Sequence, residues 1–204
     1  RLGKELDKYS LAWYEDMIPW QYTNQWKQLK NSVDTPVCTG EDIYLLDGFK
    51  PLIDNEAVSI IHPDLATSGG ILETKKIGDY AQEKGIPMAL HQAGSPIVAM
   101  ANVHCAAATE GFIGLEMHSV DNPWWDDLVN SETGKIINNG FVKVPESPGL
   151  GITLNEEAVK EHLNVNPDSW GSGMDGNPMH IYPSGAFEPT DEWDKLDSHD
   201  RTWS

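Results

Sequence analysis

Five short apolar runs recur along the N-terminal part of the chain, and each is followed by a polar residue that can carry chemistry. The runs cover residues 11–14, 36–40, 57–62, 86–90 and 111–115, and the polar residues that follow them are Glu15, Glu41, Asp64, His91 and Glu116. Successive polar residues are 26, 23, 27 and 25 positions apart. Short, continuously apolar runs are typical of strands buried on both faces. The interval leaves room for one strand, one helix and two loops, which predicts βα units and a parallel sheet.

The stretches between these runs carry helix boundary signals. Ser95 followed by Pro96 is typical of a helix start, and an apolar, Ala-rich stretch follows them. Ser68-Gly69-Gly70 is expected to open a second helix, whose apolar stripe consists of Ile77, Tyr80 and Ala81, and Gly85 lies just past its end. A third helix is expected over residues 22–33.

Polar residues at the ends of five successive strands favour an α/β fold of the (β/α)₈ TIM-barrel type, whose chemistry lies at the C-terminal ends of its strands. A doubly wound open sheet is the alternative, but it gathers its ligands at one switch point. Eight units of about 31 residues make a barrel, so residues 1–120 are expected to supply about five of them. Because residues 121–204 lack this βα rhythm and cannot supply the missing units, we expect those units to precede Arg1.

The remainder of the chain lacks this βα rhythm. Residues 121–163 contain a predicted small hairpin over 134–142 and a short acidic helix near 155–162. Residues 164–204 are rich in Gly, Pro, Trp and Asp, which is typical of a loop-like tail.

The composition argues against several function classes. The chain has 14 Lys and Arg against 32 Asp and Glu, a net charge of −18, whereas nucleic acids and anionic membranes attract basic surfaces. No apolar run approaches the roughly 18 residues of a membrane span. Cys38 and Cys105 do not make a disulfide framework, and they are interpreted as buried small apolar residues. Two cysteines fit a reducing compartment, so a cytoplasmic location is expected.

Glu15 and Glu41 are predicted to bind a metal ion. They would stand on neighbouring parallel strands, which lie about 4.8 Å apart. Two carboxylates at that distance need a cation to remain ionised, and oxygen ligands of this kind suit Mg²⁺. We expect a third acid from the preceding strand, upstream of this chain.

Asp64 and His91 are predicted to act as a pair at the ends of the next two strands. A carboxylate that accepts the imidazole Nδ1–H fixes the tautomer, so the other nitrogen can act as a general acid or base. Glu116 would hydrogen-bond the substrate or a developing anion. Two further acids near the strand ends, Asp16 and Asp42, are interpreted as caps or supporting residues. Three further histidines are interpreted as structural or rim residues: His62, His104 and His118.

At these residues the sequence resembles the enolase superfamily, in its mandelate racemase-like subgroup, over about residues 1–155. The matching segments are Trp13-Tyr14-Glu15-Asp16, Thr39-Gly40-Glu41, His62-Pro63-Asp64 with Gly69-Gly70, residues 85–91 and Gly114-Leu115-Glu116. The resemblance implies that Glu15 and Glu41 are the second and third Mg²⁺ ligands. It also implies that Asp64 and His91 form a catalytic dyad, and that Glu116 hydrogen-bonds the substrate carboxylate.

The resemblance further implies what surrounds these residues. The first metal ligand, a Lys-containing base motif and a capping domain would precede Arg1, and residues 121–163 would close the barrel. One departure is that the family commonly has Glu-Glu-Pro or Glu-Asp-Pro where this chain has Glu15-Asp16-Met17.

The implied chemistry is Mg²⁺-dependent abstraction of the proton α to a carboxylate, with an enediolate intermediate. We expect a hydro-lyase that dehydrates a sugar acid, an aldonate or aldarate, to a 2-keto-3-deoxy acid. The alternatives are a racemase, epimerase or cycloisomerase on a 2-hydroxy or sugar acid, and a catalytically silent binding paralogue. An aldolase-type barrel would need a strand-end Lys, which none of the five positions has. Family analogy implies a homo-oligomer. Polar residues expected at the rim would suit a polyol: Gln92, Asn102, Asn122 and Trp124.

Overall fold

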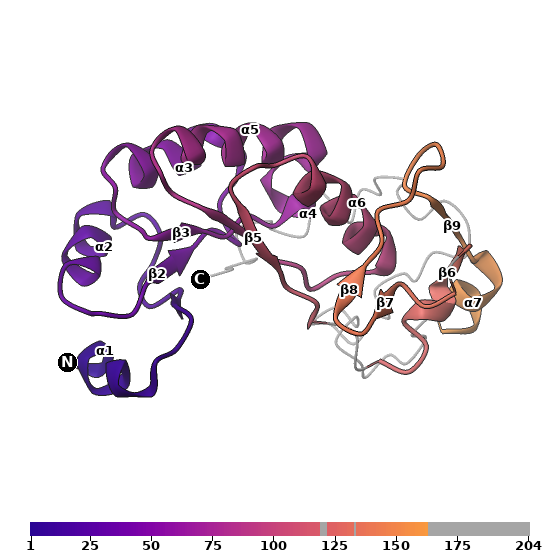
Figure 1. Cartoon of the computed structure of the whole chain (residues 1–204), viewed down its shortest axis with the longest axis horizontal. Coiled ribbons are helices and arrows are strands. Elements are labelled where there is room, and N and C mark those ends of the chain that lie inside the picture. The colour runs from indigo at the N-terminus through magenta and orange to yellow at the C-terminus, as the bar shows by residue number, and fades with distance from the viewer. Residues whose placement is uncertain (119–121, 133, 163–204) are drawn as a thin grey trace, which may run out of the picture. The chain divides into compact units, whose positions relative to one another are not determined.

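The computed structural model describes residues 1–118, 122–132 and 134–162 (Figure 1). The chain divides into two compact units, Arg1–Leu154 and Asn155–Ser204. Of the second unit only residues 155–162 are described, so the tail expected over 164–204 lies outside the described residues. In the described ranges, no helix is long and apolar enough to cross a lipid bilayer.

Five parallel strands form one sheet in the first unit. They are β1 (Tyr14–Glu15), β2 (Val37–Thr39), β3 (Ile60–Ile61), β4 (Met88–Leu90) and β5 (Phe112–Leu115). Their order across the sheet, β1-β2-β3-β4-β5, is also their order along the chain. A doubly wound sheet reverses its strand order at a switch point, whereas each strand of a barrel pairs with the next one. The order therefore confirms the predicted barrel architecture for these five units.

Helices connect the strands and cover one face of the sheet (Figure 1). The connecting helices are α2 (Thr23–Lys30), α3 (Leu45–Asp54), α4 (Leu65–Ser68), α5 (Gly70–Glu83) and α6 (Pro96–Ala107), and α1 (Leu2–Leu6) with the 3₁₀ turn η1 (Asp7–Tyr9) precedes β1. As predicted, Ser95 is the N-cap of α6 with Pro96 in its first turn, and Gly85 follows α5 at a φ of 72°.

The two faces of the sheet carry different residues. Strand residues that point toward the helices pack into the main core with large helix side chains: Tyr14, Val37, Ile61, Met88 and Leu90 with Trp26, Phe49 and Ile77. Residues between them in the strands form a separate apolar cluster with Trp13: Cys38, Ile60 and Ala89. Side chains alternate along a strand. Glu15, His62 and His91 therefore share the inner face with that cluster, nearer the carboxyl end of the sheet.

The prediction for the first strand was partly wrong. The run over residues 11–14 was expected to be the strand, but β1 begins at Tyr14 and Leu11 is 45% exposed. The pairing with β2 explains the difference, because its hydrogen bonds start where the Tyr14 amide donates to Pro36 and continue where the Asp16 amide donates to Cys38. Apolar character alone did not mark this boundary.

The segment after β5 packs against α6. The 3₁₀ turn η3 (Asp126–Leu128) leads into β6 (Val129–Ser131), which pairs antiparallel with β9 (Ile152–Leu154). The expected hairpin is formed by β7 (Ile137–Asn138) and β8 (Phe141–Val142), joined by Asn139 and Gly140 at positive φ. Apolar side chains of α6 and of this segment form a second core: Ala99, Met100 and Val103 with Trp125, Val129 and Ile136. In the second unit, α7 (Glu156–Glu161) is capped by Asn155.

Gly40, which directly follows β2, lies against the backbone of His62, which directly follows β3. Its φ is +154°, and a Cβ atom at this position would lie 2.8 Å from the backbone N and C atoms of His62 and 2.9 Å from the Phe49 ring. Neither backbone nor packed ring can move cheaply. The absence of a side chain at Gly40 therefore lets the two strand ends, and the polar residues that follow them, come together.

We expect Gly40→Ala to lower the free energy of unfolding of the whole protein by ~1–3 kcal/mol, because the added methyl group overpacks this junction. Urea titration would measure the loss. Gly111→Ala is the matched control, since a Cβ there would meet Gln82 at an ordinary 3.5 Å. Equal losses for the two variants would contradict the packing argument.

Candidate functional site

The structure brings all five residues singled out from the sequence to the carboxyl end of the sheet. Each lies at the end of a different strand or just beyond it, in the order β1 to β5: Glu15, Glu41, Asp64, His91 and Glu116. Glu15 is the last residue of β1, whereas His91 and Glu116 directly follow β4 and β5. Asp64 and His91 are paired by a parallel β-bridge beyond the ends of β3 and β4. Strand order and register, rather than closeness in sequence, therefore assemble this group.

His91 and Asp64 form the shortest contact of the group. The Nδ1 atom of His91 lies 2.7 Å from Oδ2 of Asp64. The other oxygen of Asp64 accepts a hydrogen bond from the Ala66 amide at 2.7 Å, because Asp64 is also the N-cap of α4. The Ala66 amide at the start of α4 thus orients the Asp64 carboxylate, and that carboxylate orients the His91 ring. Since Nδ1 faces Asp64, Nε2 is the ring nitrogen that faces Glu41 and Glu116.

The Nε2 atom of His91 faces two further carboxylates. It lies 3.2 Å from Oε2 of Glu41 and 3.5 Å from Oε2 of Glu116. Burial of the ring opposes its positive charge, but the hydrogen bond to Asp64 and the charges of Glu41 and Glu116 outweigh burial and raise the pKa of His91 to about 8. Near neutral pH the ring can therefore hold a proton that it can donate.

Glu15 and Glu41 come together with Asp16. One carboxylate oxygen from each of the three lies within 4.8 Å of the others. Desolvation raises the pKa of Glu41 and of Asp16, although Thr39 donates a hydrogen bond to Asp16. Trp13 donates from Nε1 to Oε2 of Glu15 at 2.7 Å, which fixes that side chain.

This carboxylate group has the properties of a cation site. Among the described residues, the lysines that form ion pairs do so with other acids, namely Asp47, Glu73, Asp79 and Glu156. Carboxylates gathered without a neighbouring Lys or Arg disfavour one another's ionisation. An oxygen-only donor set is the kind that Mg²⁺ prefers, so Glu15, Asp16 and Glu41 fit the expected ion. Asp16 was interpreted from the sequence only as a cap or supporting residue.

His62 is the residue that the sequence analysis missed. It was interpreted as structural, but its Nε2 atom lies 3.6 Å from Glu15 and 3.7 Å from Glu116, and its ring meets the His91 ring edge-on at 5.6 Å. The side chain is buried, and burial lowers its pKa. The alternation of the strand offered a signal, because His62 lies two residues after the inward-facing Ile60.

The predicted polar rim is wrong for two of its residues. Gln92 and Asn102 are fully buried, so neither is available to a substrate at the mouth. Gln92 donates from its side-chain nitrogen to the carbonyl of Gly94 at 2.9 Å, which holds the loop after β4. Asn102 faces the interior because the buried side of α6 carries it. Sequence alone did not distinguish a polar residue at the mouth from one beneath it.

Comparison with known proteins places this chain in one family. A family model described as Enolase C-terminal domain-like matches residues 1–158. D-xylonate dehydratase from Haloferax volcanii is 42% identical over 163 residues, which cover 80% of this chain and 39% of that protein. D-gluconate/D-galactonate dehydratase from Picrophilus torridus is 32% identical over 177 residues, which cover 83% of this chain and 45% of that protein.

Solved structures agree with the sequence comparisons. A mandelate racemase/muconate lactonizing enzyme-like protein from Rubrobacter xylanophilus superimposes with a TM-score of 0.77 at 36% identity, covering 79% of this chain and 41% of that one. The chain therefore spans less than half the length of these relatives.

We expect His91 to titrate near pH 8 in the metal-free whole protein and Asp64→Asn to lower its pKa, since the hydrogen bond to Asp64 favours the charged ring. Because the folded-state pKa exceeds the ordinary value of 6.5, the bound proton stabilises the fold below pH 6.5, and this stabilisation is lost as the pH rises through about 8. NMR titration of the ring resonances measures both effects. A pKa that is unchanged in Asp64→Asn would contradict the assigned pairing.

Proposed function

Because this chain belongs to the Enolase C-terminal domain-like family, we propose that the protein carrying it dehydrates a sugar acid, an aldonate or aldarate, to a 2-keto-3-deoxy acid. The observation that carries this proposal is the His91–Asp64 pair, whose second ring nitrogen faces Glu41 and Glu116. The relatives compared above are named as dehydratases of xylonate, gluconate and galactonate. These acids share a carboxylate with hydroxyl groups on the α- and β-carbons.

Glu15 and Glu41 are proposed as ligands of Mg²⁺, with Asp16 beside them. When bound, the ion would offset the negative charge that develops on the substrate carboxylate as its α-proton leaves. A further ligand is expected from the part of the relatives that this chain does not span. Trp13 would keep Glu15 oriented through its 2.7 Å hydrogen bond.

His91 is proposed as the general acid. Asp64 accepts the Nδ1–H and favours the protonated ring, and the Nε2–H is donated to the β-hydroxyl group as the carbon–oxygen bond breaks. The hydroxyl group leaves as water, and the resulting enol rearranges to the 2-keto acid. We assign the base that takes the α-proton to no residue of this chain.

Glu116 is proposed to bind the substrate. Its Oε2 atom lies 3.5 Å from Nε2 of His91 and 3.7 Å from Nε2 of His62, so it stands beside the proposed acid. A carboxylate in this place can accept hydrogen bonds from substrate hydroxyl groups. It would also orient the β-hydroxyl group toward His91.

The alternatives are an isomerase that uses the same residues and a catalytically silent paralogue. If His91 returns a proton to the α-carbon instead of protonating a leaving group, the outcome is racemisation or epimerisation, and no water is lost. A related route without water loss would be cycloisomerisation. A catalytically silent paralogue has no physical need for both a carboxylate group and a held His–Asp pair.

We expect the whole protein, supplied with Mg²⁺, to convert at least one member of a panel of aldonic and aldaric acids to a 2-keto-3-deoxy acid, detected by NMR.

His91→Asn should lower kcat by about 10²–10⁴-fold, because the leaving hydroxyl group loses its proton donor. His104→Asn, on α6, is the control and should retain activity. Full activity in His91→Asn would contradict the assignment. Solvent deuterium entering recovered substrate without keto product would favour the isomerase alternative.

We expect a chelator to abolish the activity and Mg²⁺ to restore it. Glu15→Gln and Glu41→Gln should each raise the Mg²⁺ concentration needed for half-maximal rate by about 10-fold or more, since each removes a charged oxygen donor. Glu110→Gln, an exposed acid, is the matched control. Activity that survives metal removal, or an equal shift in all three variants, would contradict the proposed site.

A further inference from the structure

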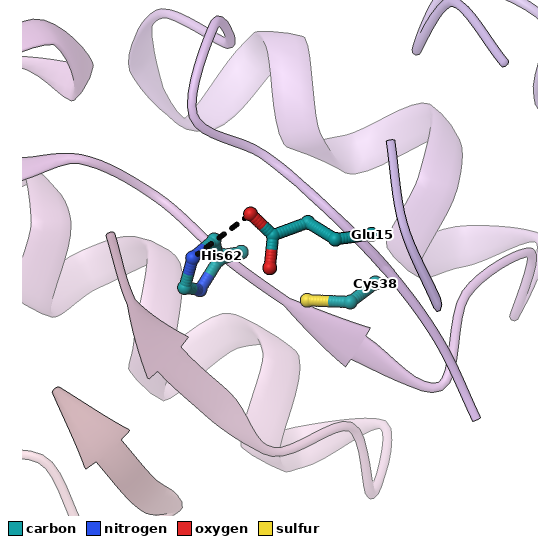
Figure 2. A group of neighbouring side chains, drawn as sticks. All are labelled: Glu15, Cys38 and His62. Atoms are coloured by element: carbon teal, nitrogen blue, oxygen red, sulfur yellow. Dashed lines mark ion pairs between the residues drawn. The ribbon is translucent and has the colours of Figure 1, made fainter. Parts of the chain in front are cut away.

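Three side chains of different chemistry meet on the inner face of the sheet (Figure 2). They are the Glu15 carboxylate, the Cys38 thiol and the His62 imidazole, and one donor atom of each lies within 4.8 Å of the other two. Glu15 and Cys38 come from the neighbouring strands β1 and β2, and His62 follows β3. The three donors thus converge from three adjacent strands of a rigid sheet.

We propose that Glu15, Cys38 and His62 form a binding site for a borderline-soft divalent cation such as Zn²⁺. The site differs from the proposed Mg²⁺ site in its donors and shares Glu15 with it. One carboxylate oxygen, one thiolate sulfur and one imidazole nitrogen are the donor types that Zn²⁺ prefers. Three protein ligands leave a fourth position of the tetrahedron for water or substrate.

His62 supplies the second, independent observation. The residue is 1% exposed, and neither of its ring nitrogens has a hydrogen-bond partner. A buried imidazole with no partner is costly, because its polar atoms have lost water without replacing it. Its Nε2 atom points at Glu15 across 3.6 Å, as the dashed line in Figure 2 marks. A cation between the two would give Nε2 of His62 a partner and offset the charge of Glu15.

Cys38 is placed for binding a metal rather than for reaction with solvent. The residue is completely buried, unpaired, and packed with Ile60, Ala89 and Trp13. Burial and the nearby Glu15 and Asp16 raise the pKa of the thiol, which is therefore protonated in the metal-free protein. On binding, the sulfur–hydrogen bond breaks, a sulfur–metal bond forms, and the proton passes to solvent.

The shared ligand has a functional consequence. Glu15 cannot give its carboxylate fully to both ions, so a Zn²⁺ ion held by Cys38 and His62 weakens Mg²⁺ binding. The proposed dehydration depends on Mg²⁺, and a soft cation would therefore inhibit it. This inference goes beyond the proposed function, since binding through the thiolate does not require turnover.

Co²⁺ titration of the whole, metal-free protein tests the proposal. Co²⁺ is the probe because thiolate ligation produces a near-ultraviolet charge-transfer absorption that oxygen ligands do not produce. We expect this absorption in the wild type, and we expect Mg²⁺ at high concentration to raise the amount of Co²⁺ required for it. Absence of the absorption in the wild type would overturn the proposal, and so would an absorption that Mg²⁺ leaves unchanged.

Variants identify the ligands. Cys38→Ala should abolish the absorption and His62→Gln should weaken Co²⁺ binding by roughly 10-fold or more, whereas Cys105→Ser, which alters the other buried cysteine, should leave it intact. Loss of the absorption in Cys105→Ser, or its survival in Cys38→Ala, would overturn the assignment. Circular dichroism checks that each variant is folded.

NMR of the wild-type protein tests the site without relying on any variant that fails to fold. Zn²⁺ should shift the ring-nitrogen resonances of His62, and unshifted resonances at saturating Zn²⁺ would overturn the site. A protein that passes these tests but dehydrates no sugar acid would overturn the proposed function and leave this inference standing.

Discussion

Parallel pairing of β1 to β5 in chain order places the residue at each strand end beside that of the next strand. Each strand is only two to four residues long, so one step of register would move every following side chain to the other face. The register is fixed by the apolar residues that must face the helices, such as Val37, Ile61 and Met88. Once those residues are buried, Glu15, His62 and His91 have no other place than the inner face. The site follows from core packing and requires no separate folding signal.

The site gathers more negative charge than its own cations can balance. Four acids stand within reach of the two histidine rings, Glu15, Glu41, Asp64 and Glu116. His91 offsets part of this charge because its pKa is raised, whereas burial keeps His62 from helping. The imbalance is the physical reason to expect a bound cation. Only these few of the acids behind the net charge of −18 therefore bear on the function of the site.

The sequence allowed the five-strand rhythm and the five strand-end residues to be predicted, because both depend on local patterns of apolar and polar residues. It did not allow the start of β1 to be predicted, since Leu11 is apolar but exposed and the strand is defined by its pairing with β2. The position of His62 depends on face alternation combined with the close approach at Gly40. Burial of Gln92 and Asn102 depends on tertiary packing of α6, which single-residue chemistry does not reveal.

His91, held by Asp64, is the proposed donor of the proton that the leaving hydroxyl group needs. A substrate analogue with fluorine in place of the β-hydroxyl group tests this most directly, because fluoride leaves without a proton donor. Fluoride release and dehydration of the hydroxyl substrate are both measured in His91→Asn. The comparison separates removal of the α-proton, which both reactions require, from protonation of the leaving group, which only dehydration requires. We expect this variant to eliminate fluoride at close to the wild-type rate while losing dehydration. Equal loss of both reactions would contradict the general-acid role of His91.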